Sequence, residues 1–194
     1  MTSVRQAAPE DRSAAVSTVV AAFSADPAWS YLLGPDYPLL APMFAGALFD
    51  QRVDGGTVWL LPDAASVAMW DPPGGPDPAR RASSWARFHE AADPGAKARL
   101  AAYDAAVDAV RPTTDFWYLG VLATRPDSAG RGGATRVLAP GLARADEDRL
   151  DSCLETSTTT NRAFYAHRGF TDAVDVQVPG GPPTWWLRRP SHTG

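Results

Sequence analysis

Cysteine and histidine are scarce in this sequence of 194 residues, which contains one cysteine, Cys153, and three histidines. A single cysteine excludes a disulfide bond within the chain and fits a reducing compartment. No residue spacing typical of a metal site is present, so we expect no metal. The sequence also lacks an apolar run long enough to span a membrane and a recognisable signal peptide. We therefore expect a cytoplasmic protein that has no membrane partner.

Basic residues are fewer than acidic residues. The chain has 18 lysine and arginine residues against 22 acidic residues, and its formal net charge is −4. Non-specific nucleic-acid binding requires clustered cations, so we expect no nucleic-acid partner. The acidity slightly favours a cationic amine as a small-molecule partner. The length and the apolar share of 45% predict one domain over residues 1–194, and leave open whether it is a monomer or a homodimer.

Glycine is most informative in the segment 121–138. This segment is typical of an apolar strand, a turn, a glycine-rich loop and a helix that begins near Ala134. Glycines let the backbone turn sharply and approach a ligand closely, and the start of a helix offers unpaired N–H groups. Together these features indicate a phosphate-binding loop, although the pattern is neither a Walker motif nor a spaced G-x-G-x-x-G. The alternative is an ordinary connection between a strand and a helix. The glycines are Gly130, Gly132 and Gly133.

A second informative segment follows about thirty residues later. Residues 153–157 predict a short strand, and a short helix follows that Thr160 or Asn161 caps and Gly169 ends. Asn161 and Tyr165 are four residues apart, so they project from one face of this helix. The two segments predict a parallel strand–helix–strand crossover with an opening at the strand ends, where a nucleotide-bearing ligand fits.

Hydrophobic periodicity predicts the other elements. The irregular, aromatic segment 27–38 interrupts them and carries Trp29 and Tyr31, which we expect to contact a substrate. The expected strands are 4–7, 57–61, 66–70, 116–123, 174–178 and 184–188. One helix is expected to begin near residue 9, and three more are expected around residues 40–48, 85–88 and 100–110. This order is that of a mixed α/β protein.

These residues resemble the GNAT superfamily of acetyl-CoA-dependent N-acetyltransferases. The pyrophosphate loop of that superfamily has the form (Gln or Arg)-x-x-Gly-x-(Gly or Ala), which corresponds here to residues 129–134. Its later Asn-x-x-x-Tyr and Gly-Phe elements match Asn161, Tyr165 and Gly169-Phe170. Within the superfamily the likeness is closest to the puromycin N-acetyltransferases, and it is strongest from about residue 117 to residue 189. Ala129 departs from the pattern, because it replaces the usual Gln or Arg.

The resemblance implies acetyl-CoA as co-substrate and a mostly antiparallel mixed sheet, flanked by helices, with a central parallel unit for the cofactor. It places the backbone amides that polarise the thioester carbonyl at Leu122, Ala123 and Thr124. The pyrophosphate would lie on the following loop and Asn161 would bond the pantetheine arm. The loop residues implied are Ala129, Gly130, Arg131, Gly132, Gly133, Ala134 and Thr135.

Acetyl transfer to an amine also requires a base and a proton donor for the leaving thiolate. Tyr165 is the candidate acid, because the pKa of a phenol is about 10. The alternative is that it is a core tyrosine. Glu155 is the candidate base, and the alternative is a structural or substrate-anchoring carboxylate. Cys153 has no readable His–Asp partner and is expected to be a packed strand residue. We therefore favour direct attack in a ternary complex over a covalent intermediate.

Three functions remain open from the sequence alone. The favoured one is N-acetylation of a primary amine on a small molecule, such as an antibiotic or a related metabolite. The second is acetylation of a protein or peptide, which requires an open groove. The third is a non-catalytic acetyl-CoA-binding regulatory module, which would not need Tyr165 or a base.

Overall fold

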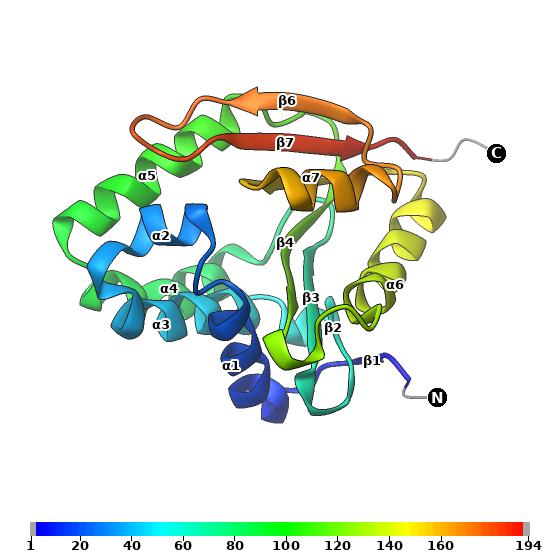
Figure 1. Cartoon of the computed structure of the whole chain (residues 1–194), viewed down its shortest axis with the longest axis horizontal. Coiled ribbons are helices and arrows are strands. Elements are labelled where there is room, and N and C mark those ends of the chain that lie inside the picture. The colour runs from blue at the N-terminus through cyan, green and yellow to red at the C-terminus, as the bar shows by residue number, and fades with distance from the viewer. Residues whose placement is uncertain (1–2, 192–194) are drawn as a thin grey trace.

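A computed structural model describes residues 3–191, in which helices cover both faces of a seven-stranded sheet (Figure 1). The strand order is β1-β2-β3-β4-β5-β7-β6, and within the described residues only β4 and β5 pair in parallel. The predicted mixed, mostly antiparallel sheet with one central parallel unit is therefore confirmed. The strands are β1 (Arg5–Gln6), β2 (Val58–Leu60), β3 (Ser66–Asp71), β4 (Phe116–Thr124), β5 (Asp151–Thr156), β6 (Asp172–Val176) and β7 (Thr184–Arg189).

The helices lie in two groups. Helices α1 to α5 lie on one side of the sheet and α6 and α7 on the other (Figure 1). Across residues 3–191, no helix has both the length and the apolar character that crossing a membrane demands. The helices are α1 (Arg12–Ala22), α2 (Pro27–Leu33), α3 (Tyr37–Asp50), α4 (Pro78–Ala91), α5 (Pro94–Asp108), α6 (Gly133–Asp148) and α7 (Thr159–Ala166).

Three of these helices begin at an Asp-Pro pair. The proline takes the first helical position, where its missing N–H group costs nothing, and the preceding aspartate caps the helix by accepting a backbone hydrogen bond. The capping bonds run to Asp26 from the N–H of Trp29 (3.0 Å), to Asp77 from that of Arg80 (2.8 Å) and to Asp93 from that of Ala96 (2.5 Å).

The prediction of an irregular connection over residues 27–38 is wrong. Helix α2 and a short 3-10 turn, Gly34–Asp36, lead directly into α3. The prolines of this segment suggest irregular structure, but each occupies the first turn of a helical element, where proline is tolerated. The other predicted helices and strands are all present.

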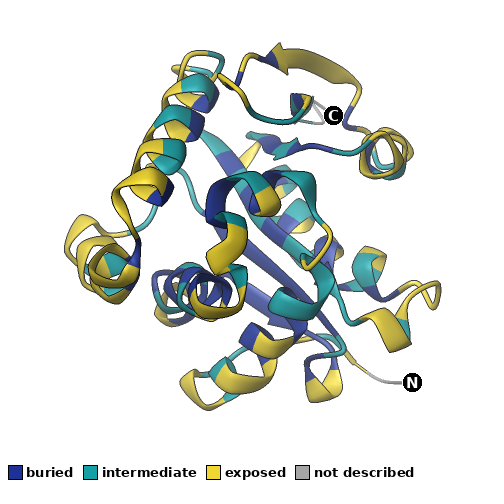
Figure 2. Ribbon diagram, turned by 60° about the vertical axis from the view of Figure 1, so that its left-hand side comes forward, coloured by how far each residue is buried: buried dark blue, intermediate teal, exposed yellow. Residues whose placement is uncertain are grey.

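Hydrophobic side chains form one cluster on each face of the sheet, and the strands between them are buried (Figure 2). On the α6 side, the helix lies very close to β3. A Cβ atom at Gly141 of α6 would lie 2.3 Å from the ring of Trp70, which is fully buried. Glycine at this position therefore sets the distance between α6 and the sheet.

A β-bulge in β4 changes which of its side chains face each group of helices. The register between β3 and β4 shifts between Met69 and Trp70, and Gly120 of β4 has no partner in β3. Tyr118 faces the α1–α5 side, whereas Leu122 faces α6 and α7. In a regular strand, residues four apart point to the same face, so the bulge is what separates these two side chains.

Strands β4 and β5 pair over three residues, from Phe116 to Tyr118 in β4, and then separate. Beyond Tyr118, β4 remains paired with β3 on its other side as far as Thr124. The edge of β4 that faces β5 is therefore free along this second half. The opening predicted at the ends of the two parallel strands is confirmed.

Candidate active site

A cavity of about 230 Å³ occupies the opening between β4 and α7. It brings together residues from α1, the free half of β4, the start of α6 and α7, which are far apart in the sequence. Five residues that are predicted from the sequence to form a cofactor and catalytic site line it. These five are Leu122, Thr124, Ala134, Asn161 and Tyr165, and the others are Ala22, Phe23, Asp26 and Phe164.

The glycine-rich loop lies at the start of α6, as predicted. Gly130 and Gly132 have φ angles of +75° and +74°, which side chains rarely adopt, and no atom lies within 4 Å of the position of a Cβ on either residue. The loop is therefore open on the side that a ligand would approach. Gly133 is required for another reason, since its Cβ would lie 2.2 Å from the hydroxyl of Ser66. The first N–H groups of α6 have no partner within the helix and point toward the loop.

Arg168 connects the two helices that border the cavity. Its guanidinium donates hydrogen bonds to the hydroxyl of Thr135 in α6 and to the carbonyl of Phe164 in α7, and it lies 3.4 Å from the ring centroid of Phe164. The arrangement fixes the start of α6 against α7. No local sequence pattern indicates Arg168, because its partner Thr135 is 33 residues away.

Helix α7 presents Asn161 and Tyr165 to the cavity. The cap of this helix is Thr158, whose hydroxyl accepts a bond from the N–H of Asn161 at 3.1 Å, so the predicted caps Thr160 and Asn161 are wrong. The exposed Asn161 is thus left to contact a ligand. At the other end, Gly169 has a φ of +89° and ends the helix as predicted. Bonds from the N–H groups of Gly169 to Ala166 and of Phe170 to Tyr165 complete this C-terminal cap.

Tyr165 is buried and lines the cavity. Its hydroxyl has no hydrogen-bond partner in residues 3–191, and burial, together with the nearby charge of Glu155, raises the pKa of the phenol. The group therefore stays protonated at neutral pH, and its hydroxyl is free to donate a hydrogen bond to a ligand. Its ring packs between Phe164 and Phe170, with centroid distances of 5.2 and 5.5 Å.

Glu155 lies on β5 and faces Tyr118 of β4. The hydroxyl of Tyr118 lies 2.7 Å from one carboxylate oxygen of Glu155 and 2.6 Å from the other. Burial raises the pKa of Glu155 to about 7, and the hydrogen bond from Tyr118 opposes that shift. A carboxylate with this pKa exchanges protons near neutral pH, as a general base requires. The role of Tyr118 could not be predicted from the sequence, because its partner Glu155 lies 37 residues later in the chain.

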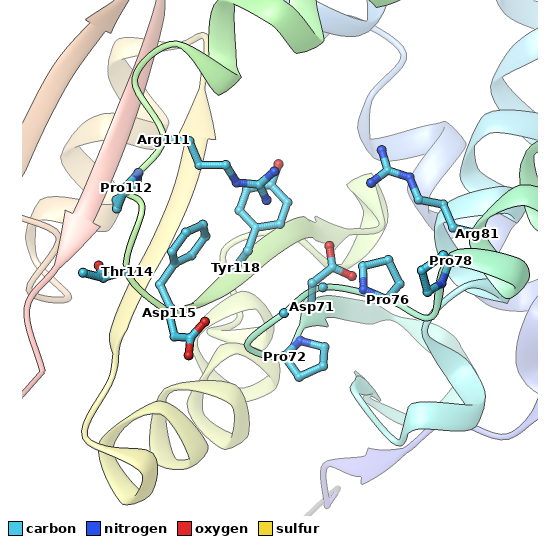
Figure 3. A pocket seen from close by; sticks show the side chains of 13 residues that line it. Asp71, Pro72, Pro76, Pro78, Arg81, Arg111, Pro112, Thr114, Asp115 and Tyr118 are labelled. Carbon is cyan, nitrogen blue, oxygen red and sulfur yellow. The ribbon is translucent and has the colours of Figure 1, made fainter.

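A second, larger cavity of about 450 Å³ lies beside Tyr118. Figure 3 shows that Arg111 and Arg81 point toward it from opposite sides, with Asp71 and Tyr118 between them. Tyr118 thus both lines this cavity and contacts Glu155. No sequence pattern predicts this cavity, because its walls come from β3, α4, the segment after α5, and β4.

The remaining candidate residues lie in different environments. Trp29 is only 6% exposed and packs in the core behind Phe23, with ring centroids 4.6 Å apart, so we assign it to the core and not to the substrate site. Tyr31 is partly exposed and donates a hydrogen bond to the carbonyl of Pro179 at 2.9 Å. Cys153 is fully buried, and burial raises the pKa of its thiol to about 12. It is a packed strand residue, as predicted.

The loop and strand residues implied for the cofactor lie along one continuous path. Leu122 and Thr124 line the cavity, and the Thr124 hydroxyl is hydrogen-bonded to that of Ser66 at 2.9 Å. The side chain of Ala123 is in the core, so only its backbone is available to a ligand. Ala129 and Arg131 lie in the exposed loop that continues from β4 to α6.

No protein-family model matches the sequence. Solved structures of acetyltransferases are nevertheless similar over almost the whole chain. A protein from Corynebacterium glutamicum, described as histone acetyltransferase HPA2 and related acetyltransferase, has a TM-score of 0.64 with 24% identity and covers 100% of this chain and 99% of its own. The polyamine N-acetyltransferase of Drosophila melanogaster has a TM-score of 0.64 with 13% identity and covers 97% and 99%.

A third similar structure is arylalkylamine N-acetyltransferase 2 of Aedes aegypti, with a TM-score of 0.62 and 12% identity over 95% of this chain and 96% of that one. At these identities the comparison establishes the fold alone. The chain therefore has the GNAT fold that the sequence resemblance predicts.

Proposed function

We propose that this protein is a single-domain, acetyl-CoA-dependent N-acetyltransferase that acts on a primary amine of a small molecule. The observation that carries the proposal is the 230 Å³ cavity where β4 and β5 separate. It gathers an open glycine loop at a helix start, the free edge of β4, Asn161 and an unpartnered phenol on Tyr165. These features suit the binding of a phosphate-bearing thioester and the polarisation of its carbonyl group.

The residues present fit acetyl-CoA, which supplies the activated acetyl group when bound. Residues 130–135 would hold the pyrophosphate through backbone N–H groups and the start of α6. Arg131 adds a positive charge in the exposed loop. The free backbone of residues 122–124 would pair with the pantetheine arm as an added strand does, and polarise the thioester carbonyl. Because Ala129 removes a side chain but no backbone donor, the loop retains its cradle.

Glu155 and Tyr165 are our candidates for the two proton transfers. Above a pH of about 7 the Glu155 carboxylate accepts the proton of the attacking amine, directly or through water. The amine nitrogen bonds to the acetyl carbon, the carbon–sulfur bond breaks, and the protonated Tyr165 donates to the leaving thiolate. The inaccessible thiol of Cys153 supports direct attack in a ternary complex.

The 450 Å³ cavity is our candidate for the acceptor site. Its wall residue Tyr118 contacts Glu155, so an amine that passes Tyr118 reaches the proposed base. The Drosophila and Aedes structures are enzymes described as acting on polyamines and arylalkylamines. Together with the sequence resemblance to puromycin N-acetyltransferases, this supports a small, partly aromatic amine such as an antibiotic. We place the reaction in the cytoplasm, since the one thiol is buried and unpaired.

The test is an acceptor panel. The purified protein is incubated with acetyl-CoA and puromycin, other aminoacyl antibiotics, arylalkylamines, a polyamine or a lysine peptide, and thiol release and acetylated product are measured. A small-molecule acetyltransferase is expected to acetylate one of the small amines, with Glu155→Gln strongly impaired. Acetylation of the lysine peptide alone would replace this proposal by the protein-acetyltransferase function. Calorimetric binding of acetyl-CoA without acetylation of any amine would indicate a regulatory module.

A further inference from the structure

Arg52 is a buried arginine that lies between α3 and the strand β2, outside the residues assigned to the reaction. Its side chain is 3% exposed. The guanidinium donates one hydrogen bond to a carboxylate oxygen of Asp71 at 2.6 Å and another to the carbonyl of Leu48 at 2.9 Å. These bonds fix the position of the guanidinium.

The same guanidinium lies against the bulge of β4. A Cβ atom on Gly120 would lie 2.5 Å from a terminal nitrogen of Arg52 and 3.4 Å from the ring of Tyr118. The guanidinium therefore fills the space that a side chain at position 120 would occupy. Gly120 and Arg52 are complementary, and a change at either one alters the support of the bulge.

The Arg52–Asp71 pair is poorly arranged for stability. Two buried polar atoms, Nε of Arg52 and Oδ1 of Asp71, have no hydrogen-bond partner in residues 3–191. A buried ion pair with unsatisfied atoms loses much of its attraction to desolvation, and an apolar pair often serves stability equally well. A role in fixing one local geometry explains the pair better than a role in holding the fold together.

The geometry that the pair fixes is the one that the proposed reaction uses. The bulge directs Tyr118 toward Glu155 and turns Leu122 to the 230 Å³ cavity that we propose for acetyl-CoA. Without it, one of these side chains would point to the wrong face, since a shift of one residue inverts a strand. We propose that Arg52, held by Asp71, is a positioning residue that fixes the β4 bulge and through it the contact of Tyr118 with Glu155. This inference rests on the proposed N-acetyltransferase function.

Two variants test the proposal. Gly120→Ala forces the guanidinium away from the bulge, and the double variant Arg52→Met with Asp71→Leu replaces the ion pair by apolar groups of similar size. Both are expected to lower kcat by about tenfold or more, as loss of positioning does. Both are also expected to move the acidic limb of the kcat/KM profile to higher pH, because Glu155 loses its hydrogen bond. If Gly120→Ala does not fold, the double variant carries the test.

A matched control is Arg189→Met with Asp146→Leu. This pair is also largely buried on its arginine side, with bonds of 2.7 and 2.9 Å, but it joins α6 to β7 away from the bulge. It is expected to change thermal stability and leave the pH limb in place. A bulge variant that folds and keeps the wild-type pH profile would overturn the proposal.

A second readout does not depend on turnover. Carbon-13 NMR of the Glu155 carboxyl group in the unliganded protein follows its titration directly, and its pKa is expected to rise in both bulge variants. This measurement separates the two proposals: if the wild-type protein acetylates no amine, the proposed function fails, while the titration still reports whether Arg52 positions Tyr118. An unchanged titration in folded variants would refute the positioning role.

Discussion

The hydroxyl of Tyr118 lies within 2.7 Å of both carboxylate oxygens of Glu155, although the two residues are 37 positions apart. Only one oxygen accepts the phenolic proton at a time, which leaves the other available to an amine. Tyr118 is the last residue of β4 that pairs with β5, and Glu155 lies two residues beyond its partner Cys153, where the two strands separate. Glu155 is thereby held at the opening.

The first prediction concerns pH. The reactive form of Glu155 is the carboxylate, so kcat/KM is expected to fall as the pH drops below about 7. Tyr118→Phe removes a hydrogen bond that lowers this pKa, so the falling limb should begin at higher pH. Tyr37→Phe, which removes a phenol bonded to the carbonyl of Val20, is the control and should leave the profile unchanged. A Tyr118→Phe profile identical to wild type would remove Glu155 as the base.

Tyr165→Phe tests the proton donor. The buried phenol has no other partner among the described residues, so its loss is expected to lower kcat by roughly 10²–10⁴-fold, as for removal of a general acid. Affinity for acetyl-CoA, measured by calorimetry, should change little, because the phosphate loop is untouched. A turnover close to that of wild type would mean that water or another residue supplies the proton.

Gly132→Val tests the loop. Its φ of +74° costs a side chain about 1–2 kcal/mol, and the valine would project into the open space where the pyrophosphate is expected. Binding of acetyl-CoA should be lost while the fold survives. Gly180→Val is a matched control, since Gly180 has a φ of +66° and equally open surroundings. If Gly132→Val binds acetyl-CoA as tightly as Gly180→Val does, the loop does not hold the cofactor.

Local signals account for most of the fold that could be predicted from the sequence. The glycine loop, the strand before it and Asn161 with Tyr165 are each determined by residues within one turn or one strand. The prediction for segment 27–38 was wrong because its prolines are compatible both with loops and with first helical turns. In the structure, Asp26 caps the helix by accepting a hydrogen bond from the N–H of Trp29. Trp29 lies in this helix, and its side chain is buried in the core.

Long-range pairings explain what the sequence could not show. In the sequence, Tyr118 is an ordinary aromatic residue of a strand, and only the structure shows that it contacts Glu155. Arg52 has the sequence character of a surface cation, and only the structure shows that it is buried against Asp71 and Gly120. Neither contact has a periodicity or a spacing rule. The bulge at Gly120 was also invisible, since a glycine within a strand is compatible with a bulge and with close packing alike.

Cys153→Ala separates direct attack from a covalent intermediate. The thiol is fully buried and burial raises its pKa to about 12, so almost no thiolate exists at neutral pH. We expect kcat to be essentially unchanged, and acetyl-CoA alone to leave no acetylated protein detectable by mass spectrometry. Loss of activity in a correctly folded Cys153→Ala protein, together with an acetylated wild-type chain, would contradict the ternary mechanism.

The last prediction concerns stability and the spacing of α6 from the sheet. In an exposed helix, replacing glycine by alanine stabilises by about 1 kcal/mol. At Gly141 the added methyl group would lie 2.3 Å from the buried ring of Trp70, so we expect Gly141→Ala to destabilise the fold by roughly 1–3 kcal/mol, as overpacking does. Ala143→Gly, at an exposed position of the same helix, measures helix propensity alone. Urea unfolding followed by tryptophan fluorescence gives both values. A stabilised Gly141→Ala protein would show that α6 can move away from β3 without cost, and that Gly141 does not set their spacing.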